Sequence, residues 1–269
     1  MPELPEMENY KKLLTEKIAE KTIMNAMIKR EKSINVPIKT FQQQVHSQKI
    51  ISIERRAKHL LFHLENGYIL LLHLMLGGWM YYGNEEDKPD RSIQVELYFG
   101  DNSLYFIGLR LGYLHLFTKK EVDSELSDLG PEPLDINFSL NAFQDLTKGK
   151  KGKLKTTLVD QKFLAGIGNC YSDEICFEAQ LLPTRTMNNL NDQEVVQLYH
   201  AIRSVLPTAT EHGGYMENPL FTNDQKTGGV SNFLKVYDRE GESCKRCGAT
   251  ILFKEVSSRK CFYCTGCQH

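Results

Sequence analysis

The 269-residue sequence has no apolar run of the roughly 18 residues that a membrane-spanning helix requires. It also lacks the basic and apolar opening of a secretory signal, since it begins Met-Pro-Glu. Neither sign of charge is in excess, with 33 Lys and Arg against 34 Asp and Glu. These absences predict a cytoplasmic globular protein without a membrane span, and the overall charge does not mark it as a nucleic-acid binder.

The charges are nevertheless unevenly distributed along the chain. The segment 148–162 contains six lysines and a single acid, Asp160, whereas acidic residues gather in 121–135. A chain that is neutral overall can still present one basic face to a polyanion. The local pattern therefore leaves nucleic-acid binding open.

The seven cysteines give no framework for disulfide pairing, because their number is odd and five of them lie between Cys244 and Cys267. Such crowding suits a metal site in a reducing compartment. Cys244, Cys247, Cys264 and Cys267 have the spacing Cys-x2-Cys-x16-Cys-x2-Cys. This spacing predicts one structural zinc ion held by four thiolates, and Cys261, which breaks the paired pattern, is not expected to be a ligand.

Apolar periodicity divides the chain into parts of different character. Residues 5–20 have the spacing of an amphipathic helix, and residues 22–118 show the alternation typical of a β-sandwich or barrel. After an acidic, proline-containing stretch, the pattern predicts helices at 139–148, 153–163, 169–181 and 191–211. Residues 213–229 are rich in Gly, Asn and Thr and exceed an ordinary connection in length, which predicts a functional loop.

The amino terminus, Met1-Pro2-Glu3-Leu4-Pro5-Glu6, allows two interpretations. If Met1 is removed, Pro2 becomes a secondary amine that titrates near pH ~8 and is partly nucleophilic at neutral pH. Its attack on a sugar carbon of aldehyde level would give an iminium, an electron sink that eases elimination of a neighbouring phosphate. Alternatively, the prolines only mark the first turn of a helix, and the hexapeptide alone favours that simpler interpretation.

Six stretches of the chain decide between these interpretations by their order and spacing. They are Pro2 to Glu6, Arg55 to Leu60, His73 to Gly78, Asp160-Gln161 with Ala165 to Tyr171, Val236 to Gly241, and Arg259 to Gln268. Together they resemble the bacterial formamidopyrimidine-DNA glycosylase and endonuclease VIII family over the whole chain, and the formamidopyrimidine branch more closely. The resemblance implies an α+β fold, in which an N-terminal helix and a two-layered β-sandwich precede a helical domain with a helix-two-turn-helix and a C-terminal zinc β-hairpin.

The resemblance also implies a domain order and a partner. The N-terminal catalytic domain would span 1–120, a linker 121–138, the helical domain with the lesion loop 139–235, and the zinc finger 236–269. The expected partner is double-stranded DNA that contains a damaged base or an abasic site, bound by a monomer in the bacterial cytoplasm at the nucleoid. Such an enzyme must take the damaged nucleotide out of the base stack before it can attack the sugar.

The implied activity is removal of an oxidised base followed by cleavage of the strand through β- and δ-elimination. By match to the family motif, Pro2 is the Schiff-base nucleophile, Glu3 the general acid and base, and Glu6 a supporting carboxylate. The resemblance also implies that Lys58 belongs to the catalytic set and binds a phosphate. The preferred lesions would be oxidised purines, namely 8-oxoguanine and formamidopyrimidines.

The DNA-binding residues carried over from the family have side chains that suit phosphate contacts. They are His73, Asn169, Tyr237 and Arg259, and the family match adds Arg110 in the gap left by the flipped base and Lys155 near the lesion. Each residue type also has a structural alternative, such as a core histidine, a solvated cation or an asparagine that caps a helix. The family spacing, and not the residue types, favours the functional interpretation.

Two positions depart from the family pattern, in which a Met, an Arg and a Phe fill the gap left by the extruded base. Here Leu76 stands for the Met and Leu111 for the Phe, while Arg110 remains. Leucine can part a base step but cannot stack as phenylalanine does. Two alternatives therefore stay open, an endonuclease VIII-like enzyme for oxidised pyrimidines and a non-catalytic binder of damaged or abasic DNA.

Overall fold

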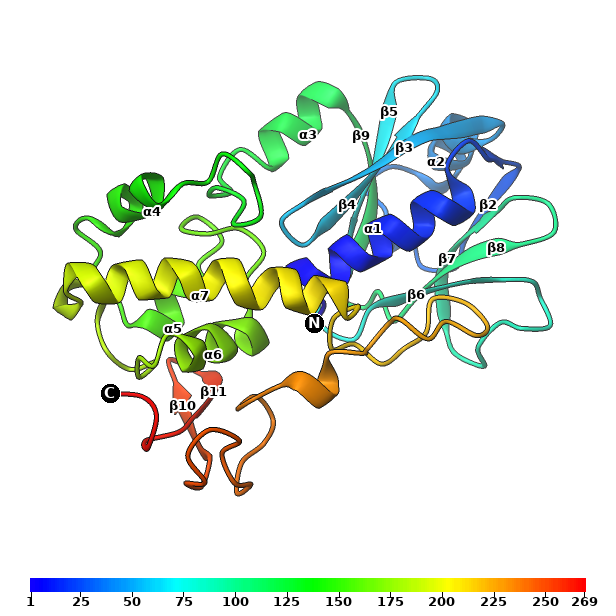
Figure 1. The fold of residues 1–269 in the computed structure, drawn as a ribbon. Coiled ribbons are helices and arrows are strands. Elements are labelled where there is room, and N and C mark those ends of the chain that lie inside the picture. The colour runs from blue at the N-terminus through cyan, green and yellow to red at the C-terminus, as the bar shows by residue number, and fades with distance from the viewer. The chain divides into compact units, whose positions relative to one another are not determined.

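The computed structural model describes all 269 residues, which divide into two compact units (Figure 1). The first unit contains Met1–Asp128 together with His212–Gly229, and the second contains Leu129–Glu211 together with Val230–His269. The chain thus leaves the first unit, returns to it for the expected loop, and ends in the second. None of its helices combines the length and the apolar character needed to cross a membrane.

Helix α1 (Leu4–Ile18) opens the first unit. Glu3 is its N-cap, and Pro5 lies in the first turn, where a fixed φ favours helix initiation. One face of the helix is completely buried, as the sequence pattern predicts, and carries Met7, Tyr10, Leu14 and Ile18. Burial of this face against the sheets accounts for most of the stability of the helix.

Two antiparallel sheets form the remainder of the first unit. The five-stranded sheet has the order β1 (Thr22–Ile23), β3 (Gln48–Arg56), β4 (His59–Leu64), β5 (Tyr68–His73) and β9 (Tyr113–Thr118). The four-stranded sheet has the order β2 (Asn25–Ile28), β7 (Ile93–Tyr98), β8 (Ser103–Ile107) and β6 (Trp79–Gly83). Two short helices, η1 (Glu31–Ser33) and α2 (Ile38–Val45), connect β2 to β3.

Both sheets contribute to one hydrophobic core. Phe62 and Leu72 of the first sheet and Val95 and Phe106 of the second belong to the same fully buried cluster. Alternate side chains of each strand therefore point inward between two layers. The β-sandwich predicted from the alternation of apolar residues is confirmed.

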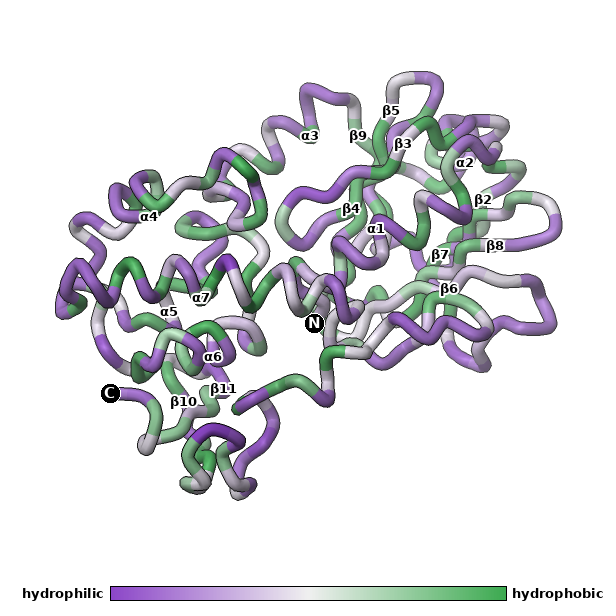
Figure 2. The backbone as a smooth tube through the Cα atoms, viewed as in Figure 1, coloured by the Kyte–Doolittle hydropathy of each residue, from purple (hydrophilic) through white to green (hydrophobic).

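The second unit is built around helices and ends in a hairpin. Its helices are α4 (Leu140–Thr147), α5 (Leu154–Leu158), α6 (Asn169–Glu178) and α7 (Asp192–Glu211), with the short helices η2 (Met187–Asn189) and η3 (Ser231–Phe233). Helix α6 packs against α7 on one side and against the hairpin β10 (Leu252–Val256) and β11 (Arg259–Tyr263) on another. Figure 2 shows hydrophobic and hydrophilic segments alternating along α7, as expected for a half-buried helix.

Two segments differ from the sequence-based expectation. Helix α3 (Lys119–Glu125) occupies the start of the acidic stretch expected as a linker, because Thr118 and Glu121 form a capping box that starts a helix there. Helix α5 ends at Leu158 instead of continuing to 163, and the Asp160 carboxylate accepts a hydrogen bond from the Lys162 N–H in the turn that follows. In both places local side-chain capping outweighs the apolar periodicity.

Candidate active site and nucleic-acid interface

The amino-terminal carboxylates meet at the start of α1. Glu6 Oε2 accepts a hydrogen bond of 2.7 Å from the Glu3 N–H, so the two residues form the capping box of the helix. Pro2, Glu3 and Glu6 are all buried. The helix start that explains the Pro-Glu-Leu-Pro-Glu motif structurally also places both carboxylates beside the chain end.

The segment 212–229 reaches the same place from the other end of the first unit. Glu6 Oε1 accepts a hydrogen bond of 2.9 Å from the Tyr215 N–H. Gly214 has a left-handed φ of 73°, and a Cβ added there would lie 2.2 Å from Glu6 Oε1. Only glycine therefore permits this approach of the loop to the carboxylate.

The loop is anchored at its far end as well. Leu220 is fully buried in the sandwich core, and its carbonyl accepts a hydrogen bond of 2.6 Å from the Tyr82 N–H. The Asp224 carboxylate receives hydrogen bonds from the backbone of Leu220, Lys226 and Thr227. The segment that the sequence marks as a functional loop is consequently held in a fixed conformation next to α1.

Lys58 lies at the turn between β3 and β4, against which α1 packs. Arg55 connects this turn to α1, since its guanidinium donates to Glu8 Oε2 at 2.7 Å and to the Ala57 carbonyl at 3.2 Å. Ala57 has a left-handed φ of 53°, and Lys58 directly after it is only 5% exposed. The turn thus holds an amino group close to the sheet face that carries the next residues.

His73 shares that sheet face with His59 and Tyr113. The two imidazole centroids are 4.4 Å apart, and His59 Nε2 lies 3.2 Å from the Tyr113 hydroxyl. Burial, reinforced by the charge of Lys58, lowers the pKa of His59 to about 4 and that of His73 to about 3. His73 Nδ1 accepts the Met75 N–H at 3.1 Å, so the neutral ring carries its proton on Nε2, where it can donate to a phosphate.

His59 and His73 make the free energy of unfolding depend on pH. Because the folded chain resists protonation of rings that titrate near 6.5 when unfolded, the free energy of unfolding is highest above about pH 6.5. It should decrease as the pH falls from there toward 4. His59→Gln should flatten this decrease when denaturant unfolding is measured at several pH values, with exposed His46→Gln as the control. Equal slopes for wild type and H59Q would contradict the assignment.

The two candidate wedge residues lie on neighbouring turns of the first unit. Leu76 is 67% and Leu111 64% exposed, although both are large apolar residues. A Cβ on Gly108 would lie 2.1 Å from the Gly77 carbonyl oxygen, so the two turns touch through their backbones. Arg30 braces the second turn by donating to the carbonyl of exposed Arg110 at 3.0 Å. The exposed side chains of Leu76 and Leu111 therefore project from two turns that support each other.

Helix α6 of the second unit begins at the candidate residue Asn169. Its side-chain oxygen is buried and has no hydrogen-bond partner. The helix dipole favours an anion at the start of a helix. The position suits a phosphate contact better than a purely capping role, since the helix has Gly168 as its N-cap and no capping side chain.

Lys155 lies in an environment that differs from the expected one. Its side chain is fully buried, and its ammonium donates to Asp173 Oδ1 and to the Asn169 carbonyl, each at 2.7 Å. Burial raises the pKa of Asp173, and the ammonium opposes that shift. The resemblance implies direct contact between Lys155 and DNA, and this burial contradicts it. The ammonium is enclosed by its ion pair, so it supports the start of α6 and does not present a charge at the surface.

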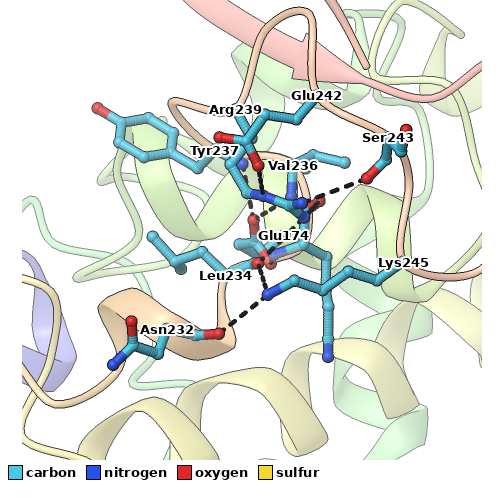
Figure 3. Close-up of polar contacts among 10 residues, drawn as sticks. Glu174, Asn232, Leu234, Val236, Tyr237, Arg239, Glu242, Ser243 and Lys245 are labelled. Atoms are coloured by element: carbon cyan, nitrogen blue, oxygen red, sulfur yellow. Dashed lines mark hydrogen bonds and ion pairs between the residues drawn. The ribbon is translucent and has the colours of Figure 1, made fainter. Parts of the chain in front are cut away.

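Two consecutive carboxylates on α6 hold the remaining candidates in place. Asp173 Oδ2 accepts the Phe262 N–H of β11 at 3.0 Å, and β11 begins with exposed Arg259. Glu174, shown in Figure 3, accepts the N–H groups of Val236 and Tyr237, each at 2.9 Å. Burial raises the pKa of Glu174, and these donors oppose the shift. One helix thus positions Asn169, Tyr237 and Arg259 together.

The four paired cysteines gather in the second unit. All four Sγ atoms lie within 4.8 Å of one another, with 3.7 Å between Cys244 and Cys267 and 3.5 Å between Cys247 and Cys264. A tetrahedral ion with sulfur ligands at about 2.3 Å needs sulfurs about 3.8 Å apart, so these residues fit a metal ion. Cys261 is buried outside the cluster, and burial raises the pKa of its thiol to about 12.

Some residues of these sites are not predicted from the sequence. Tyr215, Asp173, Glu174 and Arg30 do not stand out in the sequence. Adjacent acids within an apolar helical stretch such as 169–181 were an available signal, because buried carboxylates require partners. The role of Arg30 had no local signal, since the carbonyls of the turn that it supports lie about eighty residues away.

Comparison with known proteins agrees with this architecture. Residues 1–113 match the model of the formamidopyrimidine-DNA glycosylase N-terminal domain, and residues 129–218 match that of the formamidopyrimidine-DNA glycosylase H2TH domain. The formamidopyrimidine-DNA glycosylases of Desulfitobacterium hafniense and Pelotomaculum thermopropionicum are 35% and 33% identical to the chain, respectively. Both alignments cover 100% of this chain and at least 99% of the relative.

Solved structures of DNA complexes are similar along the whole chain. Lactococcus lactis Fpg in complex with DNA containing an abasic site has a TM-score of 0.93 at 27% identity, with 99% of each chain covered. A mutant of the Lactococcus lactis protein, in complex with DNA containing Fapy-dG, has a TM-score of 0.92 at 27% identity, with 100% of each chain covered. The fold is that of a DNA-binding repair glycosylase. The chain belongs to the formamidopyrimidine-DNA glycosylase family.

Proposed function

We propose that the protein is a bifunctional DNA glycosylase that removes oxidised purines and then cleaves the strand by β- and δ-elimination. The observation that carries the proposal is the arrangement at the chain end, where the Glu6 carboxylate accepts the backbone N–H groups of Glu3 and Tyr215 beside Pro2. Family membership supplies the chemistry, namely excision of a damaged base from DNA. The lyase step and the choice of lesion are part of the proposal.

In the proposed mechanism Pro2 acts through a free amine exposed by removal of Met1. The Pro2 nitrogen bonds to C1′ as the C1′–base bond breaks and the base leaves with the electron pair. Glu3 protonates the sugar ring oxygen so that, once the amine proton is lost to solvent, the C1′–O4′ bond opens to an iminium. The resulting iminium acidifies the C2′ hydrogen, whose loss expels the 3′-phosphate, and a second elimination expels the 5′-phosphate. Lys58 and neutral His73 bind the phosphates that these two eliminations release.

The proposed interface with DNA uses residues of each unit. Lys58 and His73 in the first unit, and Asn169, Tyr237 and Arg259 in the second, contact backbone phosphates of the duplex, while Arg110 enters the gap left by the extruded base. A structural zinc ion, bound by Cys244, Cys247, Cys264 and Cys267, holds the hairpin whose second strand, β11, begins with Arg259. The active form is a monomer on double-stranded DNA.

Borohydride trapping tests the function directly. Duplexes with 8-oxoguanine, formamidopyrimidine, thymine glycol or an abasic site are incubated with protein shown by mass to lack Met1. Covalent adducts on the two purine lesions and on the abasic site are expected. Adducts on thymine glycol instead would favour the endonuclease VIII-like alternative, and binding without any adduct would favour a non-catalytic binder.

The wedge leucines give a further prediction. Leu76→Ala and Leu111→Ala should each slow excision of a paired lesion at least about tenfold, because a leucine buried in the base stack contributes ~1.5–3 kcal/mol. Trapping at an abasic site, which is already unstacked, should change less. Single-turnover rates measure both effects, and Ile136→Ala, at a residue 90% exposed, is the matched control. Equal losses in I136A would refute a wedge role.

A further inference from the structure

Tyr215 makes a second contact that the loop geometry alone does not require. Its hydroxyl donates a hydrogen bond of 2.9 Å to the Met1 carbonyl oxygen, while its backbone N–H binds Glu6. The side chain therefore extends along the start of α1 from the carboxylate to the Met1-Pro2 peptide. Both contacts lie within the first unit.

The carbonyl that Tyr215 contacts is bonded to the Pro2 nitrogen. Standard peptide geometry separates that oxygen from that nitrogen by about 2.2 Å. The Tyr215 hydroxyl consequently lies at most about 5 Å from the atom that becomes the amine once Met1 is removed. Removal of Met1 takes away the present acceptor and leaves the hydroxyl facing the new chain end.

Tyr215 does not depend on Met1 for its position. Gly213 and Gly214, both left-handed, turn the chain onto Glu6, and further along the segment Thr222 Oγ1 pairs with the Tyr81 hydroxyl at 2.7 Å. The Thr227 hydroxyl accepts a hydrogen bond from Asn9 on α1 at 3.2 Å. The backbone that carries Tyr215 is therefore held by contacts that do not involve Met1.

We propose that Tyr215 is an additional catalytic residue, whose hydroxyl oxygen accepts a hydrogen bond from the N–H of the Pro2 amine. This bond occupies the N–H and leaves the nitrogen lone pair directed toward C1′ of the sugar. It makes no covalent bond and transfers no proton. The inference rests on the proposed function, because it assigns a partner to the same nucleophile.

Tyr215→Phe removes the hydroxyl and keeps the ring and the backbone bond to Glu6. We expect single-turnover trapping at an abasic site to slow on the order of tenfold, the effect of one lost hydrogen bond at the reacting atom. Affinity for a duplex with tetrahydrofuran, an abasic analogue that forms no iminium, should stay unchanged. A slower reaction with unchanged binding is not expected of a residue that only supports the fold.

Tyr81→Phe is the matched control, since it removes a phenol hydroxyl that holds the same segment through Thr222. It should trap at the wild-type rate. An unchanged rate in Y215F, or equal losses in Y215F and Y81F, would overturn the assignment and leave the proposed function intact. Absence of any adduct with wild-type protein lacking Met1 would instead overturn the proposed function, and the inference with it.

Discussion

A chain that keeps any residue in front of Pro2 is expected to form no borohydride-trapped adduct and to cleave abasic DNA no faster than the uncatalysed reaction. The Pro2 nitrogen is then part of an amide, whose delocalised lone pair is not nucleophilic. Protein with a retained Met1 or a short N-terminal extension can be compared by mass, trapping and gel assay with protein that starts at Pro2. Affinity for a tetrahydrofuran duplex should fall far less than the cleavage rate.

Glu3→Gln separates the two chemical steps in the same assays. With the amine free and the acid lost, excision of a damaged base should fall about 10²–10⁴-fold, the usual contribution of general acid catalysis. Trapping at a preformed abasic site should persist, because no base has to leave. Adduct formation by the N-terminally extended protein would refute Pro2 as the nucleophile.

Replacement of Cys264 by Ser should release the metal ion and unfold the terminal hairpin. A structural zinc contributes roughly 10–16 kcal/mol in small zinc modules, and a lone two-stranded hairpin such as β10–β11 is marginal by itself. Metal content should drop from one ion per chain to none, and affinity for damaged duplex should fall at least about tenfold as Arg259 loses its support. Elemental analysis and titration with labelled DNA measure the two quantities.

Cys261→Ser provides the matched control for that experiment. Cys261 lies on β11 three residues before Cys264, but it is buried outside the cluster. The variant should retain its metal ion and most of its DNA affinity. Loss of metal in C261S would contradict the exclusion of Cys261 from the ligands, and full affinity in metal-free C264S would separate the cysteine cluster from DNA binding.

The sequence predicted those features that depend on periodicity and spacing. Alternation over 22–118 predicted the sandwich, and the Cys-x2-Cys pairs predicted a cluster that fits a metal ion, as the sulfur distances confirm. The buried face of α1 followed from its helical repeat. Each of these signals lies within one stretch of the chain, so it can be recognised from the sequence without knowledge of the fold.

Features that depend on distant partners could not be predicted in this way. Lys155 belongs to a run of lysines that indicates a basic surface, but Asp173, one turn into α6, draws it into the interior. Tyr215 acquires a role only because two left-handed glycines bring it to the chain end. Charge and residue type do not reveal such pairings, since they are set by tertiary packing.

Helix α6 also restricts how the sequence can change in length. Asn169 at its start and the carboxylates of Asp173 and Glu174 face different partners, and each added residue rotates everything after it by about 100°. One insertion between 170 and 172 would break the anchors of 235–237 and of β11 together. Insertions should instead be tolerated in surface turns such as 84–90, so natural length variation is expected there and not in α6.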